Sequence, residues 1–291
     1  MDNFADYGQP ILQEVKMKNI LVIGRGIREL AVINRLSLSP AVNKIFSVPG
    51  NKEISKVCTV KDIDLTKYSQ LINFAKENNI NMVLMGSYKL IFDGLPQYFK
   101  QEKIPVLFPK EKLNQLANSR LALKKHLQNY SIPVIAGHSF DNMDAVIAHA
   151  QTFETPYVIK TDAIMNSITS ICNTLGELDN FLMHEVKEKH RGEVDIKVMF
   201  ERFVKGPVFS IPILIQGKTI IIFPFCLNIK FKSDIFFKGF YTSPFIANQK
   251  LRKNIEKNII VPLVNSLKYF IGNYSGFITI DVIVENQYPY V

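Results

Sequence analysis

The first 109 residues alternate short apolar runs with amphipathic segments, and this alternation restricts the fold more than any other feature of the sequence. The segments between the apolar runs repeat apolar residues at helical spacing, as Leu30, Ile33 and Leu36 do. Strands that alternate with helices in this way predict an α/β fold with a doubly wound parallel sheet. The apolar runs typical of buried strands are residues 19–24 (NILVIG), 43–50 (NKIFSVPG), 80–86 (INMVLMG) and 104–109 (IPVLFP).

The rest of the chain changes character twice. A basic helical segment leads into a β-α-β stretch that ends in the strand PYVIK. After residue 197 the apolar runs, one of them turning at Gly217, are typical of antiparallel strands. The predicted organisation is an N-terminal extension (1–18), a first domain (19–109) and an α+β second domain (110–291), whose smaller part is 110–196 and larger part 197–291.

The composition indicates a folded protein of the cytoplasm. Hydrophobic residues make up 47% and charged residues 21% of the chain, and the net charge of +9 is spread along it, which favours small anionic ligands. The N-terminal residues lack the apolar core of a secretion signal, and the apolar run 220–227 is too short to span a bilayer. The basic and aromatic stretch 228–240 fits an exposed strand better than a nucleic-acid surface. We expect neither a membrane nor a nucleic-acid partner.

Cysteine and histidine suggest no metal centre. The three cysteines are odd in number and widely spaced, so they indicate neither a zinc site nor a disulfide framework. None of the five histidines has the spacing of a metal ligand. We expect His126, His138 and His149 to be exposed residues of helices or loops.

Lys160 ends the apolar run PYVIK, where an ammonium group needs an anion. Because burying a charge without a partner is costly, we expect its Nζ to face Asp162 or a nucleotide phosphate, or to reach an edge. A flexible glycine loop normally follows a lysine that binds phosphate. Residues 161–169 read TDAIMNSIT and contain no glycine.

Gly24 and Gly26 follow the first strand and precede a helix. Backbone amides at such a turn can face an anion. The dinucleotide fingerprint G-x-G-x-x-G is not met, because no third glycine follows. A tight structural turn explains the two glycines equally well.

Two pairs of charged residues lie on the later predicted strands. Glu201 and Arg202 precede a turn, where a carboxylate and its backbone could contact an adenine edge, or could be surface charges. Asp281 and Glu285 lie four apart on one strand face, which suits Mg²⁺ or two edge carboxylates.

Taken in order, these segments resemble the glycinamide ribonucleotide synthetase (phosphoribosylamine–glycine ligase) family of the ATP-grasp superfamily. The family opening VLVIGxGGREHAL resembles ILVIGRGIRELAV at 20–32, and APGN resembles VPGN at 48–51. LVDFAKENNIDLTVVGPE resembles residues 71–88. The likeness spans about residues 19–285, and it continues at 115–135, 156–163 (PYVIKTDA), 199–206 (MFERFVKG) and 274–281 (YSGFITID).

The resemblance implies a pre-ATP-grasp domain that helps hold phosphoribosylamine and an incomplete ATP-grasp domain that holds ATP. In this family ATP activates the carboxylate of glycine, and the amine of phosphoribosylamine then attacks it. The resemblance places Gly24, Gly26, Arg28, Glu29, Gly50, Asn51 and Gly86 on the phosphoribosylamine side. It places Arg120, Lys160, Glu201, Phe203 and Val204 at ATP, and Asp281 at Mg²⁺.

Several departures from the family pattern predict impaired or lost ligation. The family loop ADGLAAGKG is replaced by TDAIMNSIT, which introduces Ile164, Met165 and Ile168. The ribose-binding acid falls at Pro207 or Val208, GPEAPL has become GSYKLI, and DTGPNTGGMG has no counterpart. The chain also ends at QYPYV, before the family's metal-binding strand IEFN. Two alternatives remain: a non-catalytic binding protein on the same scaffold, and a ligase with a changed substrate.

Overall fold

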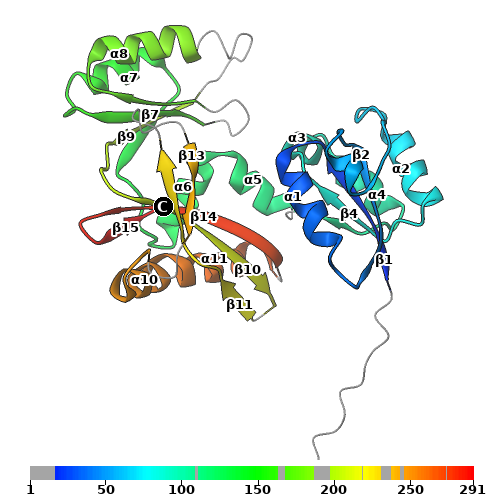
Figure 1. The fold of residues 1–291 in the computed structure, drawn as a ribbon. Helices are drawn as coiled ribbons and strands as arrows, with labels where there is room; N and C mark the ends of the chain where they lie inside the picture. The colour runs from blue at the N-terminus through cyan, green and yellow to red at the C-terminus, as the bar shows by residue number, and fades with distance from the viewer. Residues whose placement is uncertain are drawn as a thin grey trace, which may run out of the picture. The chain divides into compact units, whose positions relative to one another are not determined.

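The computed structural model divides into two compact units, Met1–Phe108 and Pro109–Val291 (Figure 1). The predicted N-terminal extension up to residue 16, the loop residues Ile164 and Met165, and residues 231–236 lie outside the described part of the chain. The structure describes residues 17–108, 111–162, 168–186, 197–217, 219–230, 237–242, 246–272 and 274–291.

The first unit contains a five-stranded parallel sheet in the order β3-β2-β1-β4-β5. Its strands are β1 (Lys18–Gly24), β2 (Val42–Pro49), β3 (Thr59–Val60), β4 (Met82–Met85) and β5 (Val106–Leu107). Its helices are α1 (Ile27–Leu36), the 3₁₀ turn η1 (Ile54–Lys56), α2 (Tyr68–Glu77), α3 (Tyr88–Phe92) and α4 (Leu95–Gln101). The predicted doubly wound parallel sheet is confirmed.

Successive side chains of β1 enter two different hydrophobic cores, which explains why helices cover both faces of this sheet. Leu21 and Ile23 enter the core that includes residues of α2 and α4, whereas Ile20 and Val22 enter a second core with Ile33 of α1. Because successive side chains of a strand point to opposite faces, a continuous apolar run requires a covering layer on each side.

The second unit begins with α5 (Glu111–Asn118) and α6 (Arg120–Asn129) and contains two antiparallel sheets. The smaller sheet has the order β6-β9-β7-β8, and Figure 1 shows α7 and α8 on one of its faces. The sequence pattern predicts that residues 198–202 belong with the later strands, but β9 pairs with β6 and β7 in this smaller sheet. The elements are β6 (Gly137–Phe140), α7 (Met143–Ala150), β7 (Tyr157–Thr161), β8 (Thr169–Cys172), α8 (Leu175–Asn180), the π-helix η2 (Phe181–Val186) and β9 (Val198–Arg202).

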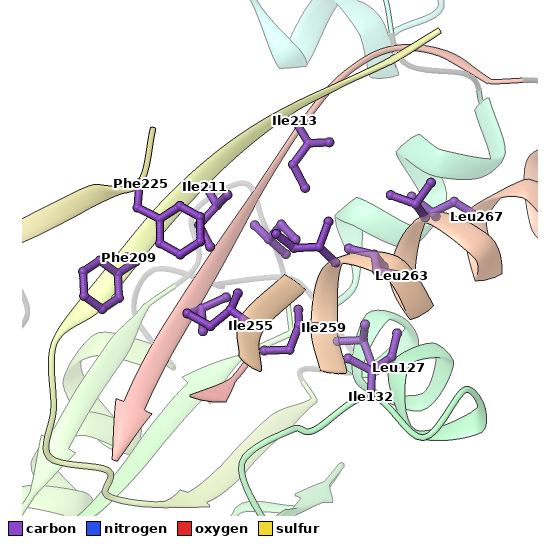
Figure 2. Close-up of a cluster of buried hydrophobic side chains, with 14 of the residues drawn as sticks. Leu127, Ile132, Phe209, Ile211, Ile213, Phe225, Ile255, Ile259, Leu263 and Leu267 are labelled. Atoms are coloured by element: carbon purple, nitrogen blue, oxygen red, sulfur yellow. The ribbon is translucent and has the colours of Figure 1, made fainter. Parts of the chain in front are cut away.

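The larger sheet follows the order β13-β12-β10-β14-β15, with β11 paired to β10. Its inner face carries Phe209, Ile211 and Ile213 of β10, which pack with Ile259 and Leu263 from the covering helices (Figure 2). The strands are β10 (Val208–Gln216), β11 (Thr219–Ile222), β12 (Cys226–Lys230), β13 (Phe237–Thr242), β14 (Ser275–Glu285) and β15 (Tyr288–Tyr290). The helices are α10 (Gln249–Ile255), the π-helix η3 (Glu256–Ile260) and α11 (Val261–Ile271).

Two of the three histidines expected at the surface are covered. His126 is buried, and its Nε2 lies 2.9 Å from the hydroxyl of Ser266, so burial lowers its pKa. The His149 ring packs edge-on against Phe200 at 4.8 Å and beside His138 at 4.9 Å. The expectation was wrong for these two residues because the His126 ring packs beside Ser266 and the His149 ring packs against Phe200. No helix in the described ranges is long and apolar enough to cross a membrane.

Candidate functional site

A cleft of about 840 Å³ opens at the carboxyl ends of the parallel strands in the first unit. The strand order reverses between β1 and β4, which is where open α/β sheets bind ligands. Five residues predicted on the phosphoribosylamine side line it: Gly24, Gly26, Arg28, Glu29 and Gly86.

Glu29 lines this cleft and is buried. Its Oε2 accepts a hydrogen bond from the Gly26 amide at 2.5 Å, closing a capping box at the start of α1. A Cβ at Gly86 would lie 2.1 Å from Oε1 of Glu29, and one at Gly24 would lie 2.6 Å from its Cγ. The glycines are therefore needed to leave room for this carboxylate.

Gly50 and Asn51, also predicted on the phosphoribosylamine side, are not among the residues that line the cleft, but they bind the loop that does. The Nδ2 of Asn51 donates to the Arg25 carbonyl at 2.7 Å, and the Gly50 amide donates to the Gly24 carbonyl at 3.2 Å. Gly50 has φ of +65°, a conformation that favours glycine. These two residues fix the loop after β1.

Charges of both signs line the mouth of the cleft. Arg25 and Arg28 follow β1, and Asp62 and Asp64 follow β3. Hydrogen bonds from the amide and hydroxyl of Thr66 hold the pKa of Asp64 below its usual range. Such a lining suits a small polar ligand that carries an anionic group and a hydrogen-bond donor or cation.

A buried ion-pair cluster forms the candidate site of the second unit. Lys124 Nζ lies 2.6 Å from Oε1 of Glu201, and Lys160 Nζ lies 2.6 Å from Oε2 of the same carboxylate. Glu201 is only 4% exposed. The prediction that Lys160 faces an anion is correct, but its partner is Glu201 and not Asp162.

Strand register brings Lys160 and Glu201 together. β7 and β9 are antiparallel with Val158 opposite Glu201, so Lys160 is a diagonal neighbour on the same face. Gly137 of β6 lies so close to β9 that a Cβ there would sit 2.2 Å from the Phe200 carbonyl oxygen. The backbone that carries Glu201 is therefore held from both sides.

The two lysines outweigh the cost of burial for the Glu201 carboxylate. Burial raises the pKa of Glu201, but the charges of Lys160 and Lys124 and their hydrogen bonds lower it further, so its pKa is lower than usual. The alternative of an ordinary surface charge at this position is wrong.

Arg120 lies among carboxylates one helical turn before Lys124. Burial lowers the pKa of Arg120, while the charges of Glu201, Asp162 and Asp281 oppose that change. Asp162 accepts from the Ser119 hydroxyl at 2.9 Å and from the Leu121 amide at 2.8 Å. The Asp162 carboxylate therefore secures the start of α6, which explains why it is not the partner of Lys160.

The segment after β9 makes a close turn onto β14. A Cβ at Gly206 would lie 1.8 Å from the Val284 carbonyl oxygen, so the two backbones pack directly against each other. Val204 is buried and Phe203 is half-buried. Arg202 forms a bidentate pair with Glu285 at 3.1 and 2.7 Å.

The two carboxylates predicted to share a face of β14 have different partners. Asp281 accepts a short hydrogen bond from the Ser210 hydroxyl, and Glu285 is taken by Arg202. Within the described ranges no group of three or more His, Cys, Asp or Glu side chains is placed to hold a metal ion. A metal at Asp281 stays a prediction.

Lys124 is the residue of this cluster that sequence reasoning missed. It was read only as part of a basic helix. Arg120 and Lys124 lie four residues apart, which places both on one face of α6. That spacing could have identified the second lysine.

Two family models match almost the whole chain in sequence. The model described as phosphoribosylglycinamide synthetase, N domain, matches residues 18–117, and the ATP-grasp (A) domain of the same family matches residues 118–291. These matches confirm the resemblance predicted from the motifs.

Curated relatives are named phosphoribosylamine–glycine ligase. The phosphoribosylamine–glycine ligase of Haemophilus influenzae is 24% identical over 285 residues, covering 94% of this chain and 66% of the relative. That of Halalkalibacterium halodurans is 27% identical over 208 residues, covering 70% and 48%. The chain thus spans about half to two thirds of the length of these relatives.

Solved structures confirm the predicted fold class. The phosphoribosylamine–glycine ligase of Thermotoga maritima superposes with a TM-score of 0.72 at 18% identity, covering 94% of this chain and 67% of the other. The biotin carboxylase domain of the Hydrogenobacter thermophilus 2-oxoglutarate carboxylase, in complex with MgADP, gives 0.74 at 13% identity, covering 94% and 63%. At these identities the likeness concerns the fold.

Proposed function

Since the chain belongs to the phosphoribosylglycinamide synthetase family, with its N domain followed by its ATP-grasp domain, we propose that it binds Mg·ATP in the second unit beside Lys160 and Glu201. The observation that supports this most is the cation–carboxylate–cation cluster that Lys160 of β7, Glu201 of β9 and Lys124 of α6 form. The Lys160 side chain is 22% exposed, although the carboxylate that pairs with it is buried.

The chemistry of this cluster fits a phosphate ligand. Two lysines and one glutamate give a net charge of +1, and the lysine side chains are already partly desolvated. An ammonium on a fixed strand is a point charge that can turn from Glu201 to a phosphate oxygen with little rearrangement.

The wider charge balance favours the magnesium complex over free nucleotide. Arg120, Lys124 and Lys160 contribute +3, and Glu201, Asp162 and Asp281 contribute −3, which sums to zero. A bare triphosphate would add negative charge that these six residues do not neutralise. Mg²⁺ usually binds through one or two carboxylates together with phosphate oxygens, and Asp281 is the carboxylate available for that role.

The segment after Glu201 suits the base of the nucleotide. Val204 is buried and Phe203 half-buried, and Gly206 is held against β14. A backbone fixed in this way can present its amide and carbonyl groups to an adenine edge beside an apolar surface. We assign this segment to adenine.

We further propose that ligation by this chain is weak or lost. In the family, ATP supplies the phosphoryl group that activates a carboxylate. Residues 161–169 (TDAIMNSIT) offer no glycine for backbone amides to wrap the phosphates, and Pro207 or Val208 stands where the family has its ribose-binding acid. The cleft of the first unit still has the family's glycines and Glu29. We therefore propose that the chain still binds phosphoribosylamine although its ligation is weak or lost.

Two measurements on the purified protein test this function. Calorimetric titration should detect Mg·ATP binding, and the heat should fall when EDTA removes Mg²⁺. ADP release with glycine and phosphoribosylamine should then remain near the rate without these substrates. Failure to bind at millimolar Mg·ATP would contradict the nucleotide site. Turnover at the rate of a full-length relative would contradict the loss of ligation.

A further inference from the structure

Glu201 holds two cations that come from different elements. Lys160 lies on β7, and Lys124 lies on α6, and each ammonium takes a separate oxygen of the carboxylate at 2.6 Å. The two lysines are not equivalent, because the Lys160 side chain is 22% exposed and that of Lys124 only 12%. Lys160 is therefore the cation that can turn to a ligand.

We infer that Lys124 is a positioning residue that keeps the Glu201 charge paired while Lys160 moves to a nucleotide phosphate. This inference rests on the proposed nucleotide site. Lys124 itself touches no phosphate in this scheme. Its role is to lower the free-energy cost of moving the Lys160 ammonium away from Glu201.

The physical reason is the burial of the carboxylate. A buried ion pair that loses one partner leaves an uncompensated charge, which is strongly unfavourable. With two lysines, the loss of one leaves Glu201 with a complete partner at Oε1. Without Lys124, the movement of Lys160 would leave the Glu201 carboxylate without a hydrogen-bonded lysine. Burial would then be the main effect on its pKa, and burial favours the protonated form.

Other charged groups near Glu201 do not replace Lys124. Arg120 on α6 interacts with Glu201 electrostatically, but it also interacts with Asp162 and Asp281. Val158, opposite Glu201 on β7, carries no charge. Among the described residues, Lys124 and Lys160 are the cations recorded as hydrogen-bonded to Glu201.

The test is the number of protons taken up with Mg·ATP. Calorimetry at pH 8 in two buffers of different ionisation enthalpy gives this number for wild type, Lys124→Met and Lys124→Arg. Lys125→Met is the matched control, because Lys125 is the exposed neighbour of Lys124 on the same helix.

We expect wild type, Lys125→Met and Lys124→Arg to take up no proton at pH 8. Lys124→Met should take up protons on binding that wild type does not, because the departure of Lys160 then raises the pKa of the buried Glu201 carboxylate. Its affinity should be on the order of a hundredfold below wild type at pH 8 and should recover as the pH falls. A residue with only a structural role would not change the proton count.

Different results separate this inference from the proposed function. If wild type binds Mg·ATP and Lys124→Met binds equally well without a proton, the inference is wrong and the nucleotide site stands. If wild type does not bind Mg·ATP, both are wrong. Should Lys124→Met fail to fold by circular dichroism, Lys124→Gln takes its place. Uptake of a full proton by wild type at pH 8 would also contradict the inference.

Discussion

The Lys160 ammonium lies 2.6 Å from Oε2 of Glu201, so this lysine near the end of β7 has the neighbouring strand's carboxylate as its counter-ion. This ion pair places a lysine that can change partner close to the end of β7. The carboxylate is buried and fixed, whereas the lysine reaches solvent. A ligand that offers a better anion than Glu201 can draw the lysine away, and nucleotide phosphates have that chemistry.

Neutralising Glu201 should destabilise the second unit. Glu201→Gln leaves Lys124 and Lys160 close together without a counter-ion in a partly buried site. We expect a loss of about 2–4 kcal/mol in the free energy of unfolding, measured by urea denaturation at pH 7. Glu53→Gln is the control, since Glu53 pairs with Lys56 on the exposed surface and should change stability by less than about 0.5 kcal/mol. Equal effects of the two changes would contradict the buried pairing.

The contribution of Glu201 should depend on pH in a defined direction. Its pKa in the folded protein is lower than the usual 4.5, so its stabilising effect is complete above that value and is lost as the pH falls through the lower folded pKa. The stability gap between wild type and Glu201→Gln should therefore be constant from pH 6 to 7 and shrink below pH 4.5. A gap that grows on acidification would show the opposite shift.

Gly206→Ala should damage the turn after β9. The added methyl would lie 1.8 Å from the Val284 carbonyl oxygen, which belongs to a central strand and cannot yield easily. We expect a loss of at least about 2 kcal/mol in thermal or urea unfolding. Gly176→Ala in α8 is the control, because its nearest neighbour is 3.9 Å away and alanine favours helix. Gly206→Ala with wild-type stability would disprove this backbone contact.

Gly86→Ala and Glu29→Ala should be strongly non-additive. A methyl at Gly86 would displace the Glu29 carboxylate, 2.1 Å away, and break its hydrogen bond to Gly26. Gly86→Ala alone should cost about 1 kcal/mol. In the Glu29→Ala background the same change should cost close to nothing. A double-mutant cycle by urea unfolding measures the coupling, and additive effects would mean that Glu29 does not occupy the space beside Gly86.

Sequence patterns predicted the first unit well because its apolar runs are continuous and its helices are regular. β1 and β4 and their glycine turns were placed correctly, and Glu29 and Gly86 were assigned to one site from separate motifs. Those assignments rested on the family resemblance. Local patterning alone left Gly24 and Gly26 open between a ligand site and a turn.

The second-unit site could be predicted only in part, because its contacts depend on register and helix packing. The need of Lys160 for an anion followed from burial, but Glu201 became its partner through the diagonal pairing of β7 and β9. Asp162, two residues further along the chain, is instead hydrogen-bonded to Ser119. Lys124 arrives from a helix, and no strand pattern could indicate it.

The most direct test of the nucleotide site is the affinity for Mg·ATP of wild type, Lys160→Met and Lys56→Met, measured by calorimetric titration. Lys160→Met keeps the length of the side chain and leaves Glu201 paired with Lys124, so the fold should persist. Lys56 is an exposed lysine that also pairs with a glutamate. The account predicts binding by wild type and Lys56→Met, and binding weakened at least about tenfold in Lys160→Met. Equal affinity in all three proteins, or no binding by folded wild type, would contradict it.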